Sequence, residues 1–283
     1  MLTKIINAPK KLVNTILTAL NDDYIIMQWA TEGVVAANWG DKLNSYLAKH
    51  VSGKTIVHRA DVYPWPPKPV HYWIGSHLAT ALSDSNAIVW GSGCISYNVP
   101  LVGMPGEIRA VRGWLSSDRL KNEGYDEVTV VGDAALLLPR FYTPKKLQKR
   151  FSLGVIPHCH EWNEPFFVTA REWPDTHLID ITGDIEDVVD QINACDRIVS
   201  SSLHGLICAD SYGVPSLWMR VSDKLAGDGF KFRDYFTSVG RPDWDPINVD
   251  VNTQRVDLER KFHDYVIDID LDSLWNECPM RLD

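Results

Sequence analysis

The chain has 283 residues, of which 45% are hydrophobic and 23% charged, and this ordinary globular composition excludes a disordered chain. Its length predicts two domains of similar size. The formal net charge of −9 argues against a nucleic-acid partner, because binding to a phosphate backbone requires a basic face. A locally basic cleft for a small anion remains compatible with this charge, and Arg109, Arg112 and Arg140 lie close enough in sequence to build one.

The cysteines and the N-terminal segment indicate a cytoplasmic protein. The 5 cysteines are widely spaced, without a CxxC pair, and we expect reduced, mostly buried thiols. No apolar run is long enough to predict a signal peptide or a membrane span. Residues 12–20 have the pattern of a short amphipathic helix that packs against the body, with peripheral membrane contact as the alternative.

Strands alternate with helices along the first half of the chain, which indicates parallel βαβ units. A proline-rich loop is expected at 63–69, because proline fits neither a helix interior nor a central strand. Helices are expected from residue 38 and over 114–122. The predicted strands are 24–30, 54–58, 71–75, 87–93, 108–112 and 127–131.

A second set of α/β elements follows a polar, basic stretch at 143–150, which we interpret as a linker. We therefore predict an α/β protein with an N-terminal Rossmann-like domain over 1–145 and a C-terminal one over 146–283. A ligand would bind in the cleft between them, at the C-terminal ends of the strands. The predicted strands of the second half are 151–157, 176–181, 196–200 and 216–219, and its helices are 185–194, one after residue 202, one after residue 229, and 254–266.

The run from Arg197 to Leu217 is the most informative stretch, because it reads as strand, turn, helix and strand with a histidine where the helix begins. Three serines at 200–202 offer capping oxygens, and apolar residues follow at helical spacing. The first turn of a helix has unpaired N–H groups and the positive end of the dipole. A phosphate or carboxylate would bind there, with His204 beside it as a proton carrier.

Four other motifs have a structural explanation beside a functional one. Asn38–Asp41 is either a ligand loop or an ordinary helix cap, and Gly91-Ser92-Gly93 is either a ligand-binding turn or only a turn. Arg112 lies next to a bend and is expected to reach the cleft as an anion-binding guanidinium, with a merely solvated arginine as the alternative. The segment 229–235, with Lys231, is either a substrate clamp or an amphipathic surface.

Two further arrangements suggest a metal site and a hydrolase site, and the sequence argues against both. His158 and His160, with Glu161 next to them, suggest a metal, but no further ligand is implied and a histidine pair on a loop is the preferred interpretation. Ser202 lies near His204, yet no G-x-S-x-G elbow surrounds it, which argues against a hydrolase.

An ordered set of motifs resembles the polysaccharide pyruvyl transferase family, in particular its succinoglycan-type bacterial members. The Leu-His-Gly sequence at Leu203, His204 and Gly205 is the centre of the resemblance. The family often has an arginine before this motif, where Ser202 stands here. The matching segments are 38–41, 91–93, 109–116, 131–139, 154–158, 201–207 and 231–235.

The resemblance implies two Rossmann-like domains in a glycosyltransferase-B arrangement that transfer the enolpyruvyl unit of phosphoenolpyruvate to a sugar as a cyclic ketal. It implies no metal, no nucleotide and no other cofactor. The expected partners are phosphoenolpyruvate and a saccharide acceptor, lipid-linked at the inner face of the membrane, with contact to the membrane biosynthesis machinery. His204 is the expected acid and Asp41 the second catalytic residue, a base or acceptor ligand by analogy. The expected substrate-binding residues are Asn38, Gly91, Ser92, Arg109, Arg112, Ser201, Ser202, Leu203, Gly205 and Lys231.

Two other functions fit the same fold. A nucleotide-sugar glycosyltransferase would bind a nucleoside diphosphate instead of phosphoenolpyruvate. A glycan-binding relative without activity is the other alternative, and the serine at position 202 supports it, whereas the presence of His204, Arg112 and Asp41 argues against it.

Overall fold

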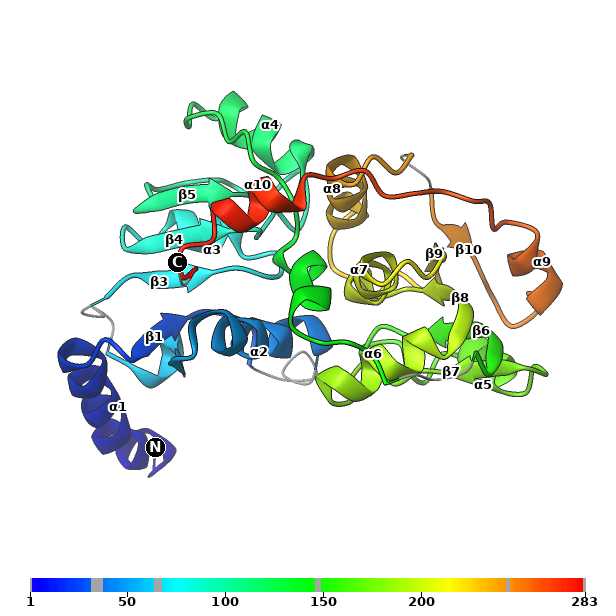
Figure 1. Cartoon of the computed structure of the whole chain (residues 1–283), viewed down its shortest axis with the longest axis horizontal. Helices are drawn as coiled ribbons and strands as arrows, with labels where there is room; N and C mark the ends of the chain where they lie inside the picture. The colour runs from blue at the N-terminus through cyan, green and yellow to red at the C-terminus, as the bar shows by residue number, and fades with distance from the viewer. Residues whose placement is uncertain (1, 32–37, 64–67, 146–148, 243–244, 282–283) are drawn as a thin grey trace.

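The computed structural model describes residues 2–31, 38–63, 68–145, 149–242 and 245–281. The central residues of the expected proline-rich loop and of the expected linker lie outside these ranges. Figure 1 shows two α/β halves side by side, with helix α1 at one end of the molecule.

Each half contains one sheet of five parallel strands. The first has the order β2-β1-β3-β4-β5 and the second the order β10-β9-β8-β6-β7. The first sheet comprises β1 (Tyr24–Met27), β2 (Thr55–His58), β3 (Val70–Tyr72), β4 (Ala87–Trp90) and β5 (Glu107–Ala110). The second comprises β6 (Phe151–Ile156), β7 (Thr176–Leu178), β8 (Cys195–Ser200), β9 (Ser216–Arg220) and β10 (Ile247–Asn248).

The two sheets repeat one topology. When the strands of each half are counted from its own first strand, both sheets have the doubly wound order 2-1-3-4-5. The strand order confirms the prediction of two Rossmann-like α/β units. Their glycosyltransferase-B arrangement stays a prediction. In such sheets ligands bind where the strand order reverses. Those points are the C-terminal ends of β1 and β3 in the first half and of β6 and β8 in the second.

Ten α-helices and two 3-10 helices lie in the described ranges. The α-helices are α1 (Leu2–Leu20), α2 (Trp39–Ser52), α3 (Leu78–Leu82), α4 (Trp114–Asn122), α5 (Pro165–Arg171), α6 (Ile185–Asn193), α7 (Leu203–Ser211), α8 (Phe230–Ser238), α9 (Arg255–Glu259) and α10 (Leu271–Asn276). The 3-10 helices are η2 (Arg59–Asp61) and η3 (Ala134–Arg140). Every helix within the described part of the chain is too short or too polar to span a bilayer.

Two sequence predictions of elements are wrong. The expected strand at 127–131 forms only a single bridge, between Val111 and Val131, and the Ser117 hydroxyl donates to the Val128 carbonyl in place of a second strand. The expected helix at 254–266 ends at Glu259. Beyond it the chain is extended, and the Tyr265 hydroxyl contacts Asp210 in α7, which is the tertiary contact that overrides the helical pattern.

One hydrophobic core joins the two halves. Trp39 and Leu43 of α2 belong to the same buried cluster as Leu203 and Leu206 of α7. The C-terminal helix α10 returns to the first half, where the Trp90 indole N–H donates to the Leu274 carbonyl at 2.9 Å. The boundary near residue 145 stays a prediction, since the chain crosses between the halves again near its end (Figure 1).

Candidate functional site

The centre of the site is the turn between β8 and α7. Ser202 is the N-cap residue of α7, in extended backbone, but its side chain makes no capping bond. The serines instead brace the turn: the Ser200 hydroxyl accepts from Ser202 N at 3.0 Å, and the Ser201 hydroxyl accepts from His158 N at 2.9 Å. Ser201 therefore joins the loop after β6 to the start of α7, which brings both strand ends of the switch point together.

Gly205 and Leu203 fix the helix to the sheet. A Cβ at Gly205 would lie 2.5 Å from the Ser200 hydroxyl oxygen, so only glycine lets α7 approach β8 this closely. Leu203 is buried on the opposite side, in the core shared with α2. This packing leaves His204 in the first turn, at the boundary between the two halves, with 8% of its surface exposed.

The first turn of α2 meets His204 from the other half. The Asn38 side chain accepts from Gly40 N at 3.2 Å, which confirms the interpretation of this residue as a helix cap. A Cβ at Gly40 would lie 2.0 Å from His204 Nδ1, so the imidazole packs directly against the backbone of α2. The N-termini of α2 and α7 thus converge on one imidazole ring with the positive ends of both helix dipoles, although Trp39 N and Gly40 N of α2 already donate to the Ile181 carbonyl and to Asn38.

Asp41 lies one residue further along α2 and is buried. Its Oδ1 accepts from Ala30 N at 3.0 Å and lies 3.5 Å from His77 Nε2. His77 is a site residue that the sequence analysis missed, because the loop after β3 carried no recognisable motif. Asp41 and His77 therefore form a polar pair beside His204, contributed by the switch point of the first half.

Asp133 is the second residue that the sequence analysis missed. It caps η3, where its Oδ1 accepts from Ala135 N at 2.9 Å. Its Oδ2 is buried, has no hydrogen-bond partner in the described part of the chain, and lies 3.9 Å from His204 Nε2, which is equally unpartnered. The available signal was the Asp-Ala-Ala sequence of a helix cap after Gly132. Two buried polar atoms that face each other without a bond indicate a functional pair.

Burial shifts the titration of both groups of this pair. It raises the pKa of Asp133 to about 6, since an ionised carboxylate is unfavourable away from water. It lowers the pKa of His204 to about 4, where Asp41 opposes the shift and the charges of Lys231 and Arg112 reinforce it. The His204 imidazole is therefore neutral at pH 7.

The Gly91-Ser92-Gly93 turn contacts the segments that carry His77 and Asp133. Gly91 has a φ of 91°, and a Cβ there would lie 2.9 Å from Ala134 N, so glycine allows the Asp133 turn to pack against β4. The Ser92 hydroxyl accepts from His77 N and donates to the Gly75 carbonyl, both at 3.0 Å. Ser92 is fully buried. In this structure the turn positions His77 and Asp133, and its expected contact with substrate stays a prediction.

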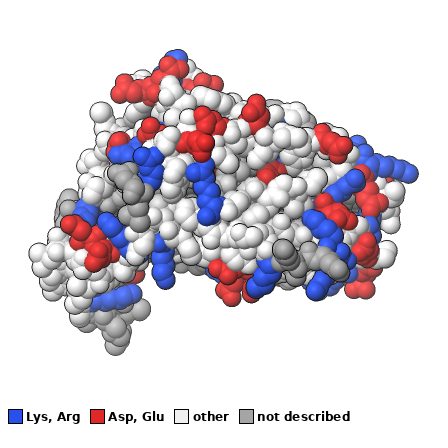
Figure 2. Space-filling view, in the orientation of Figure 1, with Lys and Arg blue, Asp and Glu red and all other residues white. Residues whose placement is uncertain are grey.

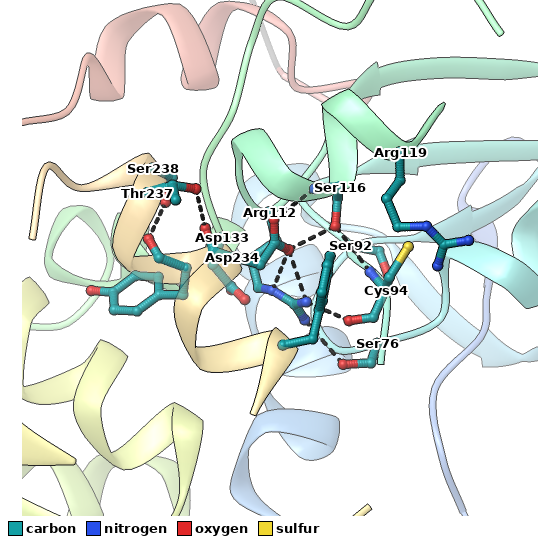
Figure 3. A network of polar contacts seen from close by, with 12 residues as sticks. Ser76, Ser92, Cys94, Arg112, Ser116, Arg119, Asp133, Asp234, Thr237 and Ser238 are labelled. Atoms are coloured by element: carbon teal, nitrogen blue, oxygen red, sulfur yellow. Dashed lines mark hydrogen bonds and ion pairs between the residues drawn. The ribbon is translucent and has the colours of Figure 1, made fainter. Parts of the chain in front are cut away.

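The position of Arg112 differs from the one expected from the sequence. Its side chain has no exposed surface, and its guanidinium binds Asp234, with Nε 3.0 Å and Nη2 2.9 Å from Oδ2 (Figure 3). It also donates to the Cys94 carbonyl at 2.6 Å and to the Ser76 hydroxyl at 3.0 Å. Asp234 belongs to α8, so this ion pair joins the two halves. The guanidinium already binds Asp234, Ser76 and the Cys94 carbonyl. The expectation that it reaches an open cleft is therefore wrong.

Arg109 lies outside the cluster. It pairs with Glu107 on the same strand at 2.9 Å. Burial and, as a smaller cause, the Arg109 charge lower the pKa of His71 of β3 to about 3. The structure therefore does not bring Arg109 together with His204.

Lys231 is the cation that does lie with His204. It occupies the first turn of α8 and is half-buried, and it forms no ion pair or hydrogen bond with the described residues. Burial and, as a smaller cause, the Arg112 charge lower the pKa of its ammonium group to about 8, against the opposing effects of Cys159, Glu161 and Asp41. Its own charge lowers the pKa of His204 and of His158. Of the three cations expected to bind substrate, Arg109, Arg112 and Lys231, only Lys231 lies near His204 without an ion pair to a described residue.

The loop after β6 contains a group that could ligate a metal. His158, Cys159 and His160 each offer one ligand atom within 4.8 Å of the others. However, His158 Nδ1 already accepts from His160 N at 3.2 Å, and burial raises the pKa of the Cys159 thiol, which disfavours the thiolate that a metal requires. Glu161 points elsewhere, with its Oε1 accepting from Ser222 at 2.6 Å. The expectation of a metal-free reaction stays a prediction.

Comparison with known proteins shows which family the chain resembles. The family model of polysaccharide pyruvyl transferase matches residues 107–223, which include Asp133, His158 and His204. The uncharacterized protein L143 of Acanthamoeba polyphaga mimivirus is 31% identical over 209 residues, which cover 72% of this chain and 71% of L143. The succinoglycan biosynthesis protein ExoV of Rhizobium meliloti (strain 1021) is 29% identical over 215 residues, which cover 72% of this chain and 62% of ExoV. No solved structure matches. The chain belongs to the polysaccharide pyruvyl transferase family.

Proposed function

We propose that this protein transfers the enolpyruvyl unit of phosphoenolpyruvate to a sugar of an exopolysaccharide or its lipid-linked precursor, forms a cyclic pyruvate ketal and releases phosphate. The observation that carries the proposal is a buried imidazole whose Nε2 has no partner in the described residues, at the meeting point of two helix N-termini and close to the charge of Lys231. Anion binding and proton transfer are the two functions that such a site can combine.

The donor has a phosphate and a carboxylate, and the site offers a partner for each. The first turns of α2 and α7 supply positive dipole ends, and the first turn of α7 also supplies backbone N–H groups. Lys231 supplies a formal charge that no described residue neutralises by an ion pair. An ammonium group partly withdrawn from water without a counter-ion is unfavourable, and a bound anion relieves that cost. Donor binding should therefore raise the pKa of Lys231.

The reaction requires a proton on the methylene carbon of the donor. An acceptor hydroxyl then adds to C2 and forms a C–O bond, the bond from C2 to the phosphate oxygen breaks with release of phosphate, and a neighbouring hydroxyl adds to close the ketal. His204 is the proposed acid. Its pKa of about 4 in the empty site leaves it neutral at pH 7, but the negative charges of the donor favour the imidazolium.

Asp133 is the proposed partner of His204 in proton transfer. With a pKa of about 6 it exchanges a proton near neutral pH, and its Oδ2 faces His204 Nε2 across 3.9 Å. Asp41 is the proposed base for the acceptor hydroxyl, held in place by Ala30 N and His77. We place the enzyme in the cytoplasm, where it would meet its acceptor at the inner face of the membrane.

Thermal unfolding with added ligands tests donor binding. Phosphoenolpyruvate should raise the melting temperature of the wild-type protein, and a nucleoside diphosphate should not. The Lys231→Met protein should lose this shift, whereas Lys121→Met, which removes a lysine paired with Glu127 on the surface, should retain it. A shift with the nucleotide alone would favour the glycosyltransferase alternative and contradict the proposal.

A further inference from the structure

Helix α1 has an inverted arrangement: its polar side faces the protein and its apolar side faces outward. The Asn14 amide donates to the Asp61 carbonyl at 3.1 Å, and the Thr15 hydroxyl accepts from Tyr63 N at 3.0 Å. Thr18 is fully buried. The outward side consists of apolar residues with large exposed fractions, namely Leu12 (51%), Val13 (53%), Ile16 (47%), Leu17 (37%) and Leu20 (83%).

These five side chains form one continuous stripe, because they recur at spacings of three and four along the helix. A surface helix normally turns such a stripe toward the core. Isolated exposed apolar residues need no explanation, whereas a continuous apolar patch indicates a binding surface. The contacts of Asn14 and Thr15 fix the rotation of α1 about its axis, so the stripe cannot turn inward without breaking them.

The charge of the helix indicates what covers this stripe. Residues 2–20 contain three lysines and no acidic residue, although the whole chain has a net charge of −9. Lys10 pairs with Asp61 at 3.4 Å, and the helix still has an excess of positive charge, so a second copy of the chain would bring two positively charged helices together, which is unfavourable. An anionic lipid surface has the opposite charge and also accepts the apolar side chains.

We propose that α1 lies in the interface of an anionic membrane, with the apolar stripe of Leu12, Val13, Ile16, Leu17 and Leu20 inserted between the lipids. The helix lies at the far end of the first half, away from the second sheet (Figure 1), and at that corner Figure 2 shows white atoms together with the blue atoms of basic side chains. The body of the protein would then rest above the membrane on its polar side. This inference does not depend on the proposed function, because it concerns binding and not turnover.

Vesicle sedimentation tests the inference with the whole protein. Vesicles of phosphatidylcholine with added phosphatidylglycerol should bind the wild-type protein, and vesicles of phosphatidylcholine alone should bind it much more weakly. The double variant Ile16→Gln, Leu20→Gln should bind at least about tenfold more weakly, since polar side chains do not insert among lipids. The matched control is Met104→Gln, Val266→Gln, which changes two exposed apolar residues outside α1 (77% and 87% exposed) and should bind as the wild type does.

Three results would overturn the inference. The first is a wild-type protein that binds neither kind of vesicle, and the second is a double variant that binds as well as the wild type. The third is a dimer in sedimentation velocity that the double variant dissociates while vesicle binding is absent, which would assign the stripe to a second copy. Thermal unfolding of both variants should match the wild type, because the substituted side chains are exposed.

Discussion

Replacing Asp133 by asparagine should stabilise the empty protein and slow its reaction. The carboxylate is fully buried, and burial raises its pKa from 3.8 to about 6. This difference corresponds to about 3 kcal/mol. Because the folded pKa lies above the unfolded one, the cost is absent below about pH 4 and fully present above about pH 6. Asparagine has nearly the same shape, keeps an oxygen for Ala135 N, and carries no charge.

Urea unfolding at a series of pH values measures this effect. The free energy of unfolding of Asp133→Asn should exceed that of the wild type by about 3 kcal/mol at pH 7, and the excess should vanish toward pH 4. The control Asp118→Asn, on the exposed side of α4, should differ little from the wild type. A variant no more stable than the wild type at pH 7, or an excess that persists at pH 4, would refute the reasoning.

The same substitution separates structure from catalysis. Asparagine cannot exchange a proton with His204, so kcat should fall while KM for the donor changes little. Stability and activity should therefore move in opposite directions. An active and stabilised variant would show that Asp133 takes no part in proton transfer.

Three further substitutions test the rest of the site. Gly40→Ala places a Cβ against His204 Nδ1 and should cost about 1–3 kcal/mol of stability and most of the activity, measured by urea unfolding and turnover. Lys231→Met should raise the melting temperature in the absence of donor, because it removes a partly buried charge that has no counter-ion among the described residues, and should weaken donor binding by about 2–4 kcal/mol in calorimetry. Arg112→Gln breaks a buried ion pair and should destabilise the protein by about 3–5 kcal/mol in urea, and adding Asp234→Asn should recover part of that loss.

The sequence predicts the local architecture well. Alternating apolar segments and turns indicate parallel α/β units, and the bounds of α4 and the start of α7 agree with expectation. The Asn38 cap and the place of His204 also follow from local chemistry. These features depend on neighbours a few residues away, which is the range that periodicity and capping rules describe.

The features that depend on distant contacts could not be predicted. The Arg112 guanidinium meets Asp234 across 122 residues of sequence, so a residue expected in the cleft is a buried link between the halves. Asp133 faces His204 only because η3 packs on α7. The apolar periodicity of α1 shows that the helix is amphipathic, but it does not show which side faces the protein.

Acceptor-dependent release of phosphate from phosphoenolpyruvate tests the central claim most directly. We predict that the wild-type protein and the control His50→Gln, which changes an exposed histidine near the end of α2, release phosphate when a suitable glycan acceptor is present. The His204→Gln protein should unfold at a temperature no lower than the wild type and release none. Equal phosphate release by a folded His204→Gln protein would contradict the assignment of His204 as the acid. Release of phosphate with no acceptor required would contradict the transfer itself.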